Sequence, residues 1–209
     1  GYPDKVEEKY SLLKVSPRDS LYTAVSKLSE TLYRYELDQL SKPVDHNRWP
    51  MPGHMVNACY DPSSNSITFP AAILQAPFYS IKQTRSQNLG GIGAVIGHEI
   101  SHAFDNNGAQ CDETGAIHNW WTKKDYEAFQ KKTKAMIEEF DGIEYHGGKV
   151  NGELVVSETI ADNGGMAVTL EIMDEMEEKN YQEYFINWAR VWCNKAREEL
   201  IRLFLSIDV

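Results

Sequence analysis

The stretch VIGHEISHAFD, residues 95–105, places two histidines four residues apart, with a glutamate directly after the first. Positions i and i+4 of an α-helix lie on one face, one turn apart, so His98 and His102 can aim their rings at one point. Glu99 is rotated from His98 by about 100° around the helix axis and does not share that face. The pattern therefore predicts a helix that presents two imidazoles together.

Neutral imidazole is a common ligand of zinc, which it binds at about 2.0–2.1 Å. If His98 and His102 hold one zinc ion, Glu99 can reach a water bound to the metal, which is the place of a general base. Asp105 lies three residues after His102 and returns to the stripe of the histidines. We expect its carboxylate to accept a hydrogen bond from a ligand histidine and to fix the tautomer of that ring.

A catalytic zinc usually has three protein ligands and leaves a fourth position for water. The stretch SETIADNGG, residues 157–165, offers the missing carboxylate, because Glu158 and Asp162 are four apart and project from one helical face. We expect Glu158 to be the third ligand. Asp162 should lie behind the metal, hydrogen-bonded to a ligand histidine.

Glycines accompany both stretches. Gly164 and Gly165 interrupt a helical run, at a cost of roughly 1 kcal/mol each relative to alanine. Gly91, Gly93 and Gly97 precede or enter the histidine motif. We expect these small residues to let the metal-binding helix pack tightly against another helix. A dinucleotide-binding loop is a poor alternative, since the third glycine falls one residue too late for that fingerprint.

Apolar periodicity and chain breakers predict a predominantly helical α+β fold. Helices are expected over residues 19–40, 88–105, 122–140, 153–178 and 181–206, with Thr122 as an N-cap. Two short strands are expected around a turn at 61–65, and a small hairpin within 144–154. The length suffices for one hydrophobic core, or for two small ones, and we expect one domain over residues 1–209.

The formal net charge is −10 and no basic stretch offsets it, which argues against a nucleic-acid partner. No run of 18 apolar residues exists, so no membrane-spanning segment is predicted. Three cysteines form no disulfide framework, and no Asn-x-Ser/Thr sequon occurs. Both features favour a reducing, cytoplasmic (bacterial) location. An extracytoplasmic location stays open, because a fragment does not show the N-terminus of its parent.

Six motifs carry a resemblance to a known family. They are VNACY (56–60), ITFPAAILQAPF (67–78), NLGGIGAVIGHEISHAFDNNG (88–108), NWWT (119–122), SETIADNGG (157–165) and NWARVWC (187–193). In this order they resemble the catalytic region of the neprilysin family of zinc endopeptidases, which includes the bacterial endopeptidase O. The resemblance covers nearly the whole chain, and it implies that residues 1–209 form one zinc metallopeptidase catalytic domain, a fragment of a longer chain. It implies a zincin-like fold and zinc-dependent hydrolysis of oligopeptides.

The resemblance also implies roles for single residues. It matches His98, His102 and Glu158 to the zinc ligands and Glu99 to the general base, and Asp105 and Asp162 to the two aspartates behind the ligands. It matches Asn57 and Ala58 to the pair that holds an extended substrate like an added strand. An apolar pocket for the residue after the scissile bond is matched by Ile73, Phe78, Val95, Val191 and Trp192.

Two other functions stay open on the sequence, a noncatalytic domain that zinc stabilises and a metalloenzyme of another reaction class. Glu99 argues against the first, because a structural zinc site closes all four positions and needs no base. The strand at Asn57 and Ala58 argues for an extended peptide substrate and against the second. Trp188 and Trp192 are four apart and most simply face a core, although the resemblance places Trp192 in the pocket as well.

The resemblance further predicts that a protein consisting of residues 1–209 binds zinc but cleaves peptides poorly. The family continues past LSIDV with a histidine that stabilises the oxyanion and an arginine that supports the substrate, and a large helical domain precedes the motifs. An oxyanion donor contributes about 3–4 kcal/mol in the transition state. The check is a comparison with Glu99→Gln: equal zinc content and similarly low turnover are expected, and turnover like that of a complete enzyme would contradict the prediction.

Overall fold

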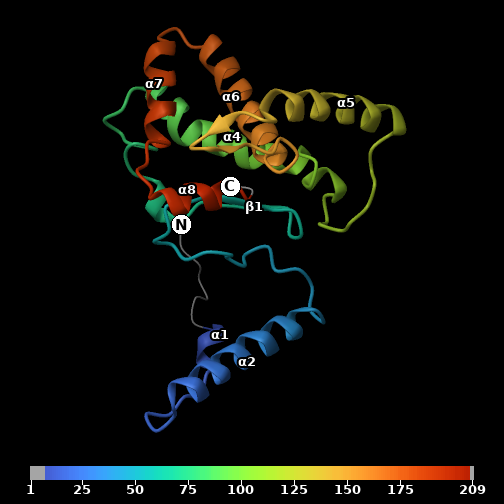
Figure 1. Ribbon diagram of the computed structural model, residues 1–209, viewed down its shortest axis with the longest axis vertical. Helices are drawn as coiled ribbons and strands as arrows, with labels where there is room; N and C mark the ends of the chain where they lie inside the picture. Colours follow the sequence, from blue (N-terminus) through green and yellow to red (C-terminus); the bar gives the residue numbers. More distant parts are fainter. Residues whose placement is uncertain (1–7, 208–209) are drawn as a thin grey trace.

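The computed structural model describes residues 8–207, and its helices dominate. The helices are α1 (Glu8–Ser11), α2 (Leu21–Gln39), α3 (Arg85–Asn88), α4 (Ala94–Ser101), α5 (Lys123–Phe140), α6 (Val156–Asp174), α7 (Tyr181–Val191) and α8 (Glu198–Phe204). In Figure 1, α4 and α6 lie together at the centre of the upper body, with α5 and α7 beside them, while α1 and α2 lie apart below. The predicted predominantly helical α+β fold is confirmed.

Helix α2 forms where its apolar spacing predicts it. Ser20 caps the helix by accepting a hydrogen bond from the backbone N–H of Thr23. No residue of α2 is buried. The segment 41–56 links this helix to the upper body as an extended trace (Figure 1). Arg48 of that segment turns back and pairs with Glu36 of α2.

Two small hairpins complete the fold, and both were predicted. Strands β1 (Cys59–Asp61) and β2 (Ser66–Thr68) pair antiparallel, with Cys59 opposite Thr68. Strands β3 (Glu144–Tyr145) and β4 (Gly148–Lys149) pair around His146 and Gly147. Both turn residues have positive φ, 47° and 79°, which is the conformation that a two-residue hairpin turn requires.

The predicted helix over 88–105 is present but irregular. It begins as α3 with a capping box in which Thr84 and Gln87 bond each other's backbone N–H groups. A π-helical segment (Leu89–Gly93) leads into α4, and a 3₁₀ turn (His102–Phe104) ends the run. The kink lies at Gly91 (φ −105°, ψ −109°). A Cβ atom there would lie 2.3 Å from the carbonyl oxygen of Phe78, so only glycine fits.

Helices α4 and α6 pack backbone against backbone. A Cβ atom on Gly97 would lie 2.8 Å from the Cα atom of Gly165, and one on Gly165 would lie 2.7 Å from the backbone nitrogen of His98. A Cβ atom on Gly164 would lie 2.1 Å from the Oγ atom of Ser101. The expectation that these glycines permit a close helix contact is therefore confirmed.

The C-terminal part of the chain differs from the sequence prediction. The helix expected over 181–206 is divided into α7 and α8, which are separated by residues 192–197. The wrong prediction has a physical reason: the run CNKAREE, 193–199, offers almost no apolar side chain that a continuous helix could bury. The helix expected over 153–178 is also shorter, since α6 spans Val156–Asp174.

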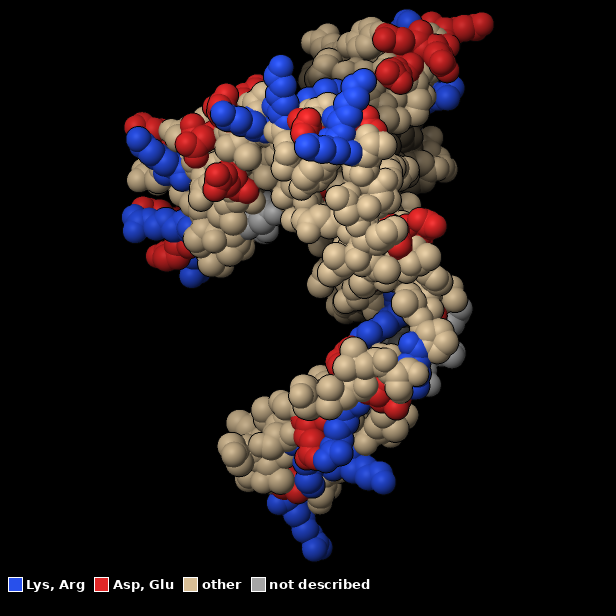
Figure 2. All heavy atoms as spheres, turned by 90° about the vertical axis from the view of Figure 1, so that its right-hand side faces the viewer, with Lys and Arg blue, Asp and Glu red and all other residues tan. Residues whose placement is uncertain are grey.

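Charged side chains of both signs are interspersed on the face drawn in Figure 2. On α5, Lys123 lies 3.9 Å from Glu127 and Lys134 lies 3.6 Å from Glu138, both pairs at i,i+4 spacing. These exposed pairs identify the outer side of α5 as a solvated face. Within the described part of the chain, none of the helices is both long and apolar enough to cross a membrane.

The α4–α6 contact leads to a prediction about stability. Substituting Gly97→Ala forces the two helix backbones apart, and we expect the free energy of unfolding to fall by about 1–3 kcal/mol. Gly93→Ala is the matched control. Its Cβ atom would meet the flexible end of Leu89 at 3.2 Å, and alanine is favoured over glycine in a helix by roughly 1 kcal/mol. Denaturant unfolding of both variants checks this, and equal effects would contradict the close-contact argument.

Candidate metal centre

Three ligand atoms from two helices converge at the centre of the molecule. The Nε2 atoms of His98 and His102 lie 2.9 Å apart. The Oε2 atom of Glu158 lies 3.2 Å from the first and 3.7 Å from the second. His98 belongs to α4, His102 opens the 3₁₀ turn that follows it, and Glu158 lies in the first turn of α6. The structure thus brings together the three residues expected to bind zinc.

Two more carboxylates hold the histidine rings from behind. The Nδ1 atom of His98 lies 2.9 Å from Oδ1 of Asp162, and the Nδ1 atom of His102 lies 2.7 Å from Oδ2 of Asp105. Asp105 is itself fixed, because its Oδ1 atom accepts hydrogen bonds from the backbone N–H groups of residues 107 and 108. Since a carboxylate only accepts, each Nδ1 atom carries a proton, so in the neutral form of each ring the Nε2 atom presents a lone pair.

This arrangement fits a zinc ion by chemistry and by size. When both rings are neutral, two imidazole lone pairs and one carboxylate oxygen face one another. Tetrahedral zinc with bonds of about 2.0–2.2 Å requires its ligand atoms to lie about 3.4 Å apart. The observed separations of 2.9, 3.2 and 3.7 Å are close to that value. Among the described residues, this is the single group of three His, Cys, Asp or Glu side chains that could hold a metal ion.

The carboxylates make the centre strongly attractive to positive charge. Burial lowers the pKa of His98, but the hydrogen bonds to Asp162 and Glu158 outweigh burial and raise it to about 10. Burial also lowers the pKa of His102, and the hydrogen bond to Asp105 reverses that effect, so the pKa is raised. The hydrogen bond with His98 lowers the pKa of Glu158. The groups that favour a proton here also favour a divalent cation in its place.

Glu99 lies beside the convergent atoms but is in a different environment. Its side chain is 5% exposed, and burial raises the pKa of its carboxyl group. The backbone N–H of Tyr60, in strand β1, faces this carboxylate and partly offsets the effect of burial on its pKa. Glu99 is therefore fixed between the metal-binding helix and the hairpin, and its raised pKa brings it closer to the range in which a carboxylate exchanges protons near neutral pH.

A cavity of about 630 Å³ opens onto these residues. Its apolar side includes Ile73, Phe78, Val95, Trp188 and Trp192, and Asn57 and Ala58 line it from the segment that enters β1. Most residues that the resemblance matched to substrate contacts therefore surround one cavity. Val191, which ends α7, is half-buried and does not line this cavity.

Trp188 is a cavity residue that the sequence argument assigned to a core. It and Trp192 form an edge-to-face pair with centroids 5.7 Å apart, and Trp192 is 54% exposed. The simplest interpretation, that both face a core, is therefore wrong. The i,i+4 spacing correctly indicated one shared face, but spacing does not show whether that face meets a core or a cavity.

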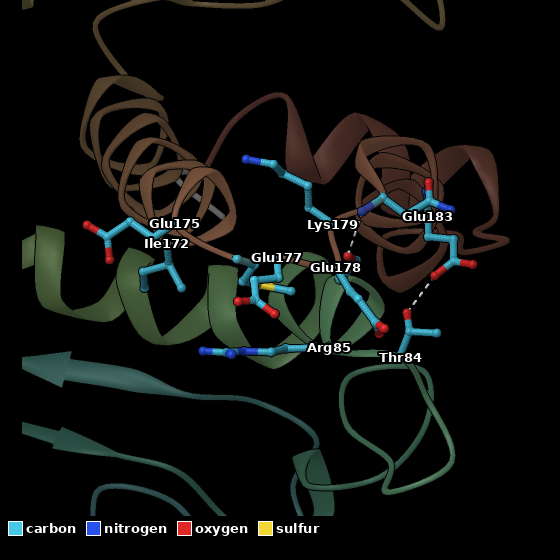
Figure 3. A pocket seen from close by; sticks show the side chains of 11 residues that line it. Thr84, Arg85, Ile172, Glu175, Glu177, Glu178, Lys179 and Glu183 are labelled. Carbon is cyan, nitrogen blue, oxygen red and sulfur yellow. Dashed lines mark hydrogen bonds between the residues drawn. The ribbon is translucent and has the colours of Figure 1, made fainter.

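A second hollow, of about 730 Å³, lies between the start of α3 and the connection from α6 to α7. Figure 3 shows Arg85, Lys179 and several glutamates around it, with a hydrogen bond between Thr84 and Glu183. Its charges are mixed, and none of its described residues belongs to a group that could hold a metal ion. The metal centre and the apolar cavity beside it therefore remain the candidate site.

Comparison with known proteins gives a consistent answer. The model of peptidase family M13 matches residues 57–209. A neutral endopeptidase of Lactococcus lactis subsp. lactis is 51% identical over 209 residues, which are 100% of this chain and 33% of that protein. A human relative, endothelin-converting enzyme 1, is 35% identical over 217 aligned positions, covering 95% of this chain and 28% of its own.

Solved structures agree with the sequence matches. The crystal structure of PEPO from Lactobacillus rhamnosis superimposes with a TM-score of 0.90 at 51% identity, covering 100% of this chain and 33% of the other. The zinc metalloprotease ZMP1 of Mycobacterium tuberculosis, in complex with an inhibitor, superimposes with a TM-score of 0.87 at 38% identity. The match covers 100% of this chain and 34% of the other. The zincin-like fold is thereby confirmed. The chain spans about a third of the length of the curated relatives it matches.

The ligand geometry predicts which histidines matter for metal binding. His98→Ala removes one of three ligands, so we expect the zinc content of the purified protein to fall to background. His118→Ala is the matched control, since His118 is largely exposed and its nearest acidic partner, Asp112, lies 3.5 Å away.

Metal analysis measures the zinc content, and the melting temperature with and without a chelator measures how far the bound ion stabilises the fold. A chelator should lower the melting temperature of the unmodified protein and of His118→Ala, because an ion that binds only the folded state stabilises it. The chelator should leave the melting temperature of His98→Ala unchanged. Full zinc content in His98→Ala would contradict the assignment of this centre.

Proposed function

The chain belongs to peptidase family M13, and on that premise we propose that it forms the zinc centre of an endopeptidase that hydrolyses oligopeptides. His98, His102 and Glu158 hold the metal, and Asp105 and Asp162 orient the two histidines. The observation that carries the proposal is the convergence of three ligand atoms at 2.9–3.7 Å beside a buried glutamate that is not itself a ligand. The names of the relatives, neutral endopeptidase and zinc metalloprotease, support it.

Each side chain has a defined task in this proposal. A zinc ion bound by the three ligands supplies a Lewis acid, which polarises the scissile carbonyl group and acidifies water. Glu99 accepts the proton from the attacking water and delivers it to the nitrogen of the leaving amine. The raised pKa of its buried carboxyl group suits the first half of that transfer, because a stronger base takes the proton from water more readily.

The edge of β1 suits an extended peptide. The N–H of Tyr60 points toward Glu99, on the side of β1 away from β2. Backbone groups two residues apart in a strand point the same way, so the N–H and C=O of Ala58 also face the cavity that this residue lines. A substrate strand can pair with these groups as an added strand, while the side chain of Asn57 lies at the same edge.

The alternatives are weaker on the same observations. A zinc-stabilised domain without catalysis has no use for a buried glutamate beside the metal or for a cavity of about 630 Å³ open to it. A metalloenzyme of another reaction class has no use for an unpaired strand edge next to the base. Peptide hydrolysis uses the metal, the base, the edge and the apolar cavity together.

The decisive substitution is Glu99→Gln in the full-length, zinc-loaded protein. Glutamine keeps the shape of the side chain but cannot accept the proton, so we expect peptide hydrolysis to fall by about 10²–10⁴-fold. Zinc content should not change, because Glu99 is not among the three ligands. Initial rates on an internally quenched peptide and metal analysis of the same sample measure both quantities.

Glu171→Gln is the matched control for this experiment. Glu171 is an exposed residue of α6 and has no contact with the cavity, so hydrolysis should remain at the level of the unmodified protein. If Glu99→Gln retained full activity at full zinc content, another group would have to serve as the base and the proposed mechanism would be wrong.

A further inference from the structure

A single buried amide joins three segments that are far apart in the sequence. Asn187 lies in the middle of α7 and is 1% exposed. Its Nδ2 atom donates to the carbonyl oxygen of Pro77 at 3.0 Å and to that of Gln87 at 2.8 Å. Both N–H bonds of the amide are therefore used, one on the loop before α3 and one at the end of α3.

The loop at Pro77 is also tied to the beginning of the metal-binding helix. The backbone N–H of Ile92 donates to the carbonyl oxygen of Phe78 at 2.7 Å. A Cβ atom on Gly91 would lie 2.3 Å from that oxygen and 2.9 Å from Nδ2 of Asn187. The amide, the loop and the kinked helix thus meet within van der Waals distance, and a glycine at the kink leaves room for them.

The segments joined by this amide carry one side of the cavity. Phe78 directly follows Pro77, Trp188 directly follows Asn187, and Trp192 lies one turn later. All three line the cavity beside the metal centre. The metal ligands depend on a different contact, the packing of α4 on α6 at Gly97 and Gly165. The position of the aromatic wall can therefore change without displacement of the ligands.

We propose that Asn187 is a positioning residue for substrate specificity: its two hydrogen bonds hold Phe78 and Trp188 at the spacing that admits a large apolar side chain of the peptide. The inference rests on the proposed peptidase function. When the amide is removed, the part-buried carbonyl of Gln87 loses this donor and that of Pro77 keeps only its bond from Gln83 at 3.2 Å. Helix α7 is then no longer tied to the loop or to the end of α3, and the two can separate. The cavity then no longer encloses a large side chain closely, whereas a small one loses little.

The test compares two peptides in the full-length, zinc-loaded protein. They are internally quenched and differ only in leucine or alanine directly after the scissile bond. We expect Asn187→Ala to lower the ratio of kcat/KM for leucine over alanine by about tenfold, within the range by which an apolar pocket discriminates. The change should appear mainly as a higher KM for the leucine peptide, with kcat and zinc content little altered.

Tyr184→Phe is the matched control. Tyr184 is on the same helix, is fully buried and loses the hydrogen bond of its hydroxyl to Thr169 at 2.7 Å. It does not line the cavity. Asn187→Ala loses two hydrogen bonds and Tyr184→Phe loses one, so both variants should melt at a lower temperature, but Tyr184→Phe should keep the preference of the unmodified protein.

Two results would overturn the proposal: an unchanged leucine-over-alanine ratio in Asn187→Ala, or an equal loss of preference in both variants. Should Asn187→Ala fail to fold, Asn187→Leu fills the same volume without a donor and is judged by the same ratio.

A binding measurement separates this proposal from the proposed function. In the zinc-loaded Glu99→Gln background, calorimetric titration gives the affinity of the two peptides without turnover. If the unmodified protein hydrolyses neither peptide, the peptidase proposal fails, and the binding preference in this background still tests Asn187. If hydrolysis proceeds but Asn187→Ala binds leucine and alanine peptides in the original ratio, the positioning role alone is wrong.

Discussion

The contact between the backbones of α4 and α6 is the constraint on which the site depends. His98 and His102 come from one side of this contact and Glu158 from the other. With glycine at 97 and at 165, the helices approach until a Cβ atom on either would collide with the opposite backbone. A separation larger by one methyl group would move the carboxylate away from the imidazoles. The ligand spacing of 2.9–3.7 Å therefore follows from two missing side chains.

Charge then divides the acidic residues of the site into different tasks. Asp105 and Asp162 face Nδ1 atoms and set the tautomers, so the Nε2 lone pairs point inward. Glu158 has its pKa lowered by His98 and remains an anion suited to a cation. Glu99 is buried as well, at 5% exposed, and its pKa is raised by that burial. The pKa values of Glu99 and Glu158 are thus shifted in opposite directions because their surroundings differ.

The metal centre and the apolar wall are held by separate interactions. Helix packing sets the positions of the ligands, while hydrogen bonds from one buried amide join the loop at Pro77, the end of α3 and α7. Such a division allows the cavity to vary in shape while the chemistry at the metal stays the same. It also explains why the helix before the histidines is kinked: Gly91 lies where the loop, the amide and the helix all need space.

Much of this follows from local rules that the sequence states directly. The 3.6-residue period places His98 with His102 and Glu158 with Asp162, and Thr122 caps α5. The glycines at 97, 164 and 165 indicate a close helix contact. These features depend on neighbours within about two helical turns, so no distant residue has to be known. The sequence alone therefore determined which side chains share a face.

Only the tertiary structure decided what each face meets. It placed Trp188 at a cavity and not in a core, directed the N–H of Tyr60 to Glu99, and ended α7 at Val191. It also joined Asn187 to carbonyl groups 100 and 110 residues away. Periodicity carries no information about such partners, because burial and hydrogen bonding across the fold depend on where distant segments pack.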